Sequence, residues 1–172
     1  MKIPSRGPCL RVFNLALLLA TLLPGALLAD ARPAWLLVNL PSQESIVTTD
    51  TAERDKLTEV GWKVDGSGSL LTGGQQGAGA LHRLWRATPQ GADRVLETDI
   101  AQIPIWVKAG YVDEGSVGFV AAADGPGRVP VYQYRKGEKR IWLINDKTQA
   151  AAKNAGWKLQ GVHFWLWPSI TK

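Results

Sequence analysis

The chain has 172 residues, of which 45% are hydrophobic, and its formal net charge at pH 7 is +5. This length suits one domain with one modest core. The single cysteine excludes a disulfide framework. Lysine and arginine form no dense run outside residues 135–140, which argues against nucleic-acid binding.

Residues 1–31 have the three-part form of a secretory signal peptide. Three basic residues precede a mostly apolar run at residues 12–28, and Ala29-Asp30-Ala31 offers a small-x-small cleavage site. Cleavage after Ala29 is a second candidate. An uncleaved membrane anchor is the alternative, although the apolar run is short and interrupted by Pro24. We therefore expect export of residues 32–172 to the periplasm or beyond, without cysteine and with a net charge of +3.

A 17-residue stretch follows three times without a gap, at residues 50–66, 99–115 and 145–161. Each copy opens on Asp or Asn, reaches a glycine–aromatic pair eleven positions later, and closes on glycine. A match of this kind indicates an internal repeat. The repeated positions are Asp50, Asp99 and Asn145, then Gly61, Gly110 and Gly156, then Trp62, Tyr111 and Trp157.

Each copy is predicted to form a short helix. Asp or Asn at its start is a good N-cap, and the internal glycine supplies the left-handed residue that ends a helix. Glu53 and Gln102 stand where a capping box requires them. Pro104 lies past the first turn of the second copy and should distort that helix. Trp62 and Trp157 are expected in the core.

Runs of β-branched and aromatic residues predict four strands per unit, two before the helix and two after it. The units cover about residues 34–74, 80–124 and 130–168, and the last two strands of each are separated by a predicted turn. Such a unit cannot bury its own apolar face, so three should close around a common core. The predicted fold class is mainly β with short helices: a single pseudo-threefold, β-trefoil-like domain of twelve short strands. The predicted turns are Asp65-Gly66, Glu114-Gly115 and Gln160-Gly161.

The repeated pattern resembles a secreted repeat domain of unknown function that occurs in bacteria and fungi, usually as three units. The matching segments are Val131-Tyr132-Gln133-Tyr134, Thr48-Thr49-Asp50, Ala52-Glu53-Arg54-Asp55, Gly61-Trp62 and Glu114-Gly115. The resemblance covers residues 35–167 and implies a domain that accompanies secreted hydrolases or stands alone behind a signal peptide. The family's second strand usually carries Asp-His-Phe-Tyr-Thr, and none of the three units here has that histidine.

No motif for catalysis was found. His82 and His163 are predicted to lie in different strands, with no cysteine or third histidine to complete a zinc site. The chain has no G-x-S-x-G motif and no phosphate loop. The acids at the predicted turns would lie too far apart for glycoside hydrolysis. We therefore predict a protein that is not an enzyme, with no catalytic residue, no metal and no cofactor.

The eight tryptophans carry the most functional information, and unit three is the most aromatic. Exposed Trp and Tyr can stack on sugar rings or anchor a partner, whereas the simpler interpretation is that they fill a small core. Arg135 and Arg140 could be polar partners of such a site. The candidate binding residues are Trp165, Trp167, Tyr132, Tyr134 and His163.

The sequence thus predicts a secreted, non-catalytic domain that binds carbohydrate or the cell envelope. The alternative is a protein-interaction or inhibitor module on the same scaffold. The expected partner is a polysaccharide or a surface protein. We expect a monomer that binds no nucleic acid and does not insert stably into a membrane.

Overall fold

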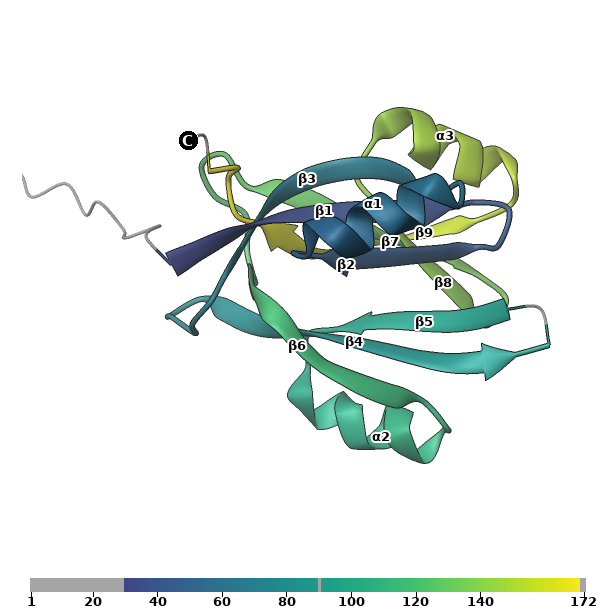
Figure 1. Cartoon of the computed structure of the whole chain (residues 1–172), viewed down its shortest axis with the longest axis horizontal. Helices are drawn as coiled ribbons and strands as arrows, with labels where there is room; N and C mark the ends of the chain where they lie inside the picture. The colour runs from purple at the N-terminus through teal and green to yellow at the C-terminus, as the bar shows by residue number, and fades with distance from the viewer. Residues whose placement is uncertain (1–29, 90, 171–172) are drawn as a thin grey trace, which may run out of the picture.

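The computed structural model describes residues 30–89 and 91–170 (Figure 1). Along this part of the chain, the order strand, strand, helix, strand occurs three times, and we call the three segments units one, two and three. Unit one consists of β1 (Ala31–Asn39), β2 (Glu44–Thr48), α1 (Thr51–Glu59) and β3 (Lys63–Leu71). Unit two consists of β4 (Ala78–Thr88), β5 (Gly91–Glu97), the 3-10 turn η2 (Ile100–Gln102), α2 (Ile103–Lys108) and β6 (Val112–Ala121). Unit three consists of β7 (Val129–Lys136), β8 (Lys139–Leu143), α3 (Asp146–Asn154) and β9 (Lys158–Leu166).

All the strands belong to one antiparallel sheet. In each unit the first strand lies between the other two. The units are joined where the ends of β3, β6 and β9 meet, through the pairs Leu71–Phe119 and Ala121–Trp165 and a bridge from Ser69 to Trp167. The strand pairs diverge from this junction, with α2 and α3 at opposite edges of the molecule (Figure 1). The mainly β fold class is confirmed.

The prediction of twelve strands is wrong, because the described residues form nine. The predicted turns at Asp65-Gly66, Glu114-Gly115 and Gln160-Gly161 are irregularities inside the continuous strands β3, β6 and β9, where the register with the neighbouring strand shifts. A β-bulge bends a strand without ending its pairing. The two strands predicted after each helix are therefore one bent strand.

The predicted helix boundaries are confirmed. The side chains of Asp50, Asp99 and Asn145 each accept a hydrogen bond from the backbone N–H two residues later, at 2.8, 3.0 and 2.8 Å. Gly61, Gly110 and Gly156 end the helical segments with φ of +94°, +88° and +85°, in the left-handed region that favours glycine. The aromatic residues that follow are buried, so Trp62 and Trp157 lie in the core as predicted.

Two details of the helices differ from simple capping rules. Glu53 forms no capping box, because its carboxylate accepts a hydrogen bond from Arg83, while the N–H of Asp50 donates to Thr48 Oγ1. In unit two the helical segment is divided into η2 and α2, with Pro104 in the first turn of α2. This division is the distortion that Pro104 was predicted to cause.

One hydrophobic cluster takes side chains from all nine strands, so the expected common core is confirmed. Burying one large apolar side chain stabilises a fold by about 1.5–3 kcal/mol. The central members are Leu36, Val47, Leu70, Leu81, Leu84, Val95, Leu96, Val120, Val131, Trp142, Phe164 and Leu166.

The predicted signal peptide, apart from Asp30 and Ala31, lies outside the described residues. In the part of the chain that the structure describes, the helices are too short or too polar to cross a bilayer.

Asp65, at the bulge of β3, ties unit one to unit three. It is 5% exposed, and its Oδ2 accepts hydrogen bonds from the backbone N–H groups of Ile144 (2.5 Å) and Asn145 (3.1 Å). Its Oδ1 accepts from the hydroxyl of Thr148. These donors belong to the start of α3, whose N–H groups have no partner within the helix. Asp65 therefore holds the first turn of α3 against β3.

Replacing Asp65 with Ala should lower the free energy of unfolding by about 2 kcal/mol, because partly buried donors at the start of α3 lose a charged acceptor. Urea unfolding measures this loss. The control is Asp55→Ala, since the Asp55 side chain is 60% exposed and its ion pair with Arg54 lies on the surface; that change should cost no more than about 0.5 kcal/mol. Equal effects of the two substitutions would contradict the role given to Asp65.

Candidate functional site

The five candidate binding residues do not form one exposed face. Tyr134 is fully buried and its hydroxyl donates to Gln149 Oε1 at 2.9 Å. Trp167 is 7% exposed and its Nε1–H donates to the carbonyl of Phe119. Neither ring is available to stack on a ligand. Trp165 and Tyr132 are partly exposed, but they pack against two different hydrophobic clusters.

His163, the fifth candidate, is held by aromatic neighbours. Its Nδ1 accepts a hydrogen bond from Nε1–H of Trp142 at 3.2 Å, and its ring meets that of Phe164 edge to face. Burial lowers the pKa of His163 below its ordinary value, and the charge of Glu97 opposes that shift. The imidazole is therefore neutral at pH 7, with its proton on Nε2. It lines a small hollow of about 190 Å³ between units two and three.

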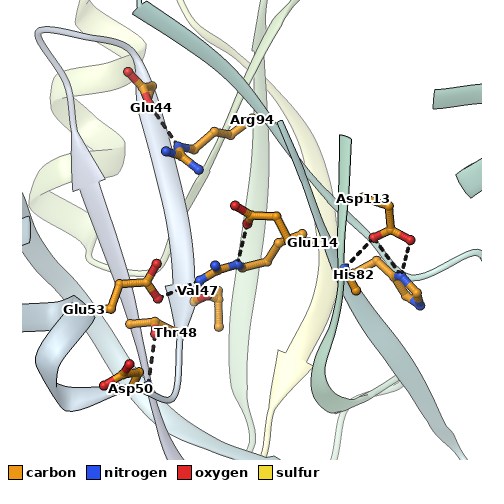
Figure 2. Close-up of polar contacts among 11 residues, drawn as sticks. Glu44, Val47, Thr48, Asp50, Glu53, His82, Arg94, Asp113 and Glu114 are labelled. Carbon is orange, nitrogen blue, oxygen red and sulfur yellow. Dashed lines mark hydrogen bonds and ion pairs between the residues drawn. The ribbon is translucent and has the colours of Figure 1, made fainter. Parts of the chain in front are cut away.

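A larger groove, of about 580 Å³, separates α1 from unit two, and we call it the α1 groove. Arg83 of β4 lies on its wall and pairs with two carboxylates, those of Glu53 and Glu114 (both labelled in Figure 2). Its guanidinium donates to Glu53 at 2.7 Å, to Glu114 at 2.9 Å and to the carbonyl of Val47 at 3.4 Å. Because two acids neutralise this arginine, the network serves first as a tie between units one and two.

A histidine–carboxylate pair lies beside this network. Nδ1 of His82 is 3.1 and 3.2 Å from the carboxylate oxygens of Asp113, which also accepts from the N–H of Gly115 (Figure 2). Ser116 is paired with His82 across the strands, but its hydroxyl donates to the carbonyl of Gly118. The hydroxyl is therefore engaged elsewhere, and the three residues are not arranged as a nucleophile with its base. In the described part of the chain, no three His, Cys, Asp or Glu side chains are grouped to hold a metal ion.

A third groove, of about 220 Å³, lies where α2 faces β7 and β8. We call it the arginine–aromatic groove. Its side chains come from six segments of units two and three, which only the folded chain brings together. The residues that define it are Arg86 (β4), Asp93 (β5), Trp106 (α2), Tyr111 (after α2), Arg135 (β7) and Arg140 (β8).

The aromatic rings of this groove hold its guanidinium groups in place. The rings of Trp106 and Tyr111 meet edge to face at 5.2 Å. Arg86 lies over Tyr111 at 4.6 Å, and Arg140 lies over Trp106 at 4.9 Å. A cation over a ring face gains about 0.5–1 kcal/mol or more. The two rings therefore support Arg86 and Arg140.

The charges in the groove are only partly balanced. Arg86 pairs with Asp93 at 3.4 Å, and Asp93 also accepts a hydrogen bond from the hydroxyl of Tyr111 at 2.5 Å. Burial, and then the hydrogen bond to Asp93 and its charge, raise the pKa of Tyr111 to about 12. Arg135 and Arg140 form no ion pair with any residue that the structure describes. Two guanidinium groups thus remain available to an anionic ligand.

Sequence reasoning found part of this groove. Arg135 and Arg140 stand in the basic run and were named as polar partners of unit three, and Tyr111 was found as a repeat position. Arg86 and Asp93 gave no signal, because they meet only through the register of β4 with β5.

The raised pKa of Tyr111 has a consequence for stability. The native protein holds the Tyr111 proton more tightly than the unfolded chain does, so this contribution is intact below pH 10 and is lost as the pH rises from 10 towards 12. Between pH 9 and 11, wild type should lose about 1 kcal/mol more stability than Tyr111→Phe. Urea unfolding at both pH values tests this expectation. Parallel losses in the two proteins would contradict it.

The family model of a domain of unknown function (DUF5648) matches residues 33–167. Neither a curated protein nor a solved structure matches the chain.

Proposed function

The chain belongs to the DUF5648 family, and because that family is described only as a domain of unknown function, we propose a function from the site itself. We propose that the domain is an exported, non-catalytic module that binds polysaccharide. The observation that carries this proposal is the arginine–aromatic groove, in which fixed guanidinium groups, a tyrosine and two carboxylates surround one hollow.

The size of the groove favours one unit of a long ligand. Pockets that enclose a drug-sized molecule measure about 300–1,000 Å³, whereas this groove measures about 220 Å³ and is open to solvent. Its lining offers both donors and acceptors, from Arg86, Arg135 and Arg140 and from Asp93 and Glu138. Sugar units carry many hydroxyl groups that need both kinds of partner. A polysaccharide could place one unit in the hollow and continue over the surface on either side.

The three-part form of residues 1–31 supports export. N-terminal sequencing of the exported protein should find a start at Asp30 or Arg32. Recovery of the uncleaved chain from the membrane would contradict a cleaved signal peptide.

We further propose that the units are related by pseudo-threefold rotation, as in a β-trefoil. Two observations support this: the ends of β3, β6 and β9 meet pairwise, and the contacts between units form a cycle. Asp65 of unit one binds the start of α3, Arg83 of unit two binds Glu53 of α1, and Arg140 of unit three lies over Trp106 of α2. An experimental structure in which a third of a turn fails to superpose the units would contradict the symmetry.

A protein-interaction module is the second candidate, and the outer face of α2 favours it. Ile105 and Val107 of α2 are 58% and 48% exposed, and Ile100 of the preceding turn η2 is 72% exposed. The exposed positions of α1 and α3 are mostly polar or alanine. Exposed apolar side chains on one short helix are typical of a docking surface. Ile105→Ser separates the two candidates: it should leave polysaccharide binding unchanged, but it should abolish retention of a protein partner if α2 is the interface.

A glycan array with the purified protein tests the first proposal. We expect the wild-type protein to bind polysaccharide. Arg140→Gln should weaken this binding about tenfold, because a hydrogen bond to a charged group contributes about 1.5–3 kcal/mol. The matched control is Arg54→Gln. Arg54 lies over Trp35 at 4.5 Å, which is the same kind of stacking outside the groove. No glycan bound at all, or equal losses in both variants, would contradict the proposal.

A further inference from the structure

The register of the sheet places three cations side by side in unit three. Arg135 of β7 is paired with Arg140 of β8 on one side and with Lys158 of β9 on the other. Side chains of directly paired residues point to the same face of a sheet, and neighbouring strands are about 4.8 Å apart. Arg140, Arg135 and Lys158 therefore form a row across three strands, which we call the cation row.

This arrangement is unfavourable in the free protein, because like charges directly opposite each other destabilise a sheet. None of the three forms an ion pair with a residue that the structure describes. Arg135 is exposed, and among the described residues it donates only to the carbonyl of Gly137, at 2.8 Å. Lys158 is also exposed. An anion that lies over the row would relieve the repulsion.

The other two units show that the fold does not require this row. The corresponding positions are Ser45, Val38 and Lys63 in unit one. In unit two they are Arg94, Trp85 and Val112. Each of these rows carries one cation beside uncharged neighbours. The accumulation of charge in unit three is therefore a property of that surface and not of the repeated scaffold.

Two grooves meet at the row. Arg135 lines the arginine–aromatic groove on one side and, on the other, a groove of about 360 Å³ that is also lined by Lys136, Lys158 and Gln160. An extended ligand can follow both grooves across Arg135. A polymer with regularly spaced anionic groups meets this geometry better than a single small anion does.

We propose that the cation row binds an acidic polysaccharide whose sugar units carry carboxylates. This inference rests on the proposed function and names its ligand class. The planar fork of a guanidinium matches a carboxylate with two hydrogen bonds, while the lysine ammonium adds a point charge. Single-stranded nucleic acid is less suited, since its binding relies on stacking of bases on aromatic side chains. In this groove Tyr111 is buried, and Arg140 lies over the ring of Trp106.

The test measures binding of the exported protein to polygalacturonate and to the same polymer with its carboxylates methyl-esterified. We expect binding to the acid form alone. This binding should be weaker at about 200 mM NaCl than at about 50 mM NaCl, because salt screens exposed charge pairs. Arg135→Gln and Lys158→Gln should each weaken it at least about fivefold. Lys63→Gln is the matched control, since Lys63 holds the place of Lys158 in unit one; it should bind as wild type does.

Thermal unfolding supplies a second readout. Without polymer, Arg135→Gln should melt at the temperature of wild type or above it, because repulsion is removed. Polygalacturonate should raise the melting temperature of wild type more than that of Arg135→Gln at the same polymer concentration. A lower melting temperature for the polymer-free variant would contradict the repulsion on which the inference rests.

The outcomes separate the inference from the proposed function. Equal binding of the esterified polymer would overturn the acidic ligand and leave polysaccharide binding intact. Failure to bind any polysaccharide would overturn both. If dextran sulfate or oligothymidylate binds as tightly as polygalacturonate and with the same dependence on Arg135, the row is a general polyanion site, and the assignment to a carboxylated polysaccharide is wrong.

Discussion

The structure depends on a core that no single unit can form. Each unit is a three-stranded antiparallel element with a short helix outside it, and a repeat unit of about 45 residues cannot bury its apolar face alone. The described chain solves this by joining β3, β6 and β9 at their ends and by placing side chains of all nine strands in one cluster. Since the chain carries no cysteine after residue 9, packing and polar contacts between units must supply the stability.

The contacts between units differ in chemistry. Asp65 binds backbone donors of α3, Arg83 is enclosed by two glutamates, and Arg140 packs on Trp106. The first two are internally neutralised or hydrogen-bonded, so they chiefly hold the units together. The third leaves charge exposed at the boundary of units two and three. The candidate site therefore lies where one contact between units has unbalanced charge.

The helices were predictable because their signals are local. An N-cap oxygen and a left-handed glycine act within one turn, so Asp50, Gly61 and their equivalents mark the helix ends without knowledge of the fold. Asp65-Gly66 was misread as a turn because the same residue types suit a turn and a bulge, and only the pairing with β1 distinguishes them.

The groove could be predicted only in part, because only some of its residues lie close together in the sequence. Arg135 and Arg140 are close in sequence, whereas Arg86 and Asp93 reach the groove through strand register and the packing of α2. The alternation of Trp165, Leu166 and Trp167 does not reveal which face of the strand is buried. Trp167 was therefore assigned to a binding surface, although it lies in the interior.

Equilibrium unfolding in guanidinium chloride, followed by tryptophan fluorescence and far-ultraviolet circular dichroism, tests the common core most directly. Tryptophans lie in all three units, at Trp35 and Trp62, at Trp85 and Trp106, and at Trp142 and Trp157 among others. One shared core predicts a single transition with the same midpoint for both signals. Two separated transitions, or a fluorescence change that precedes loss of the β signal, would show that the units fold independently and would contradict the account.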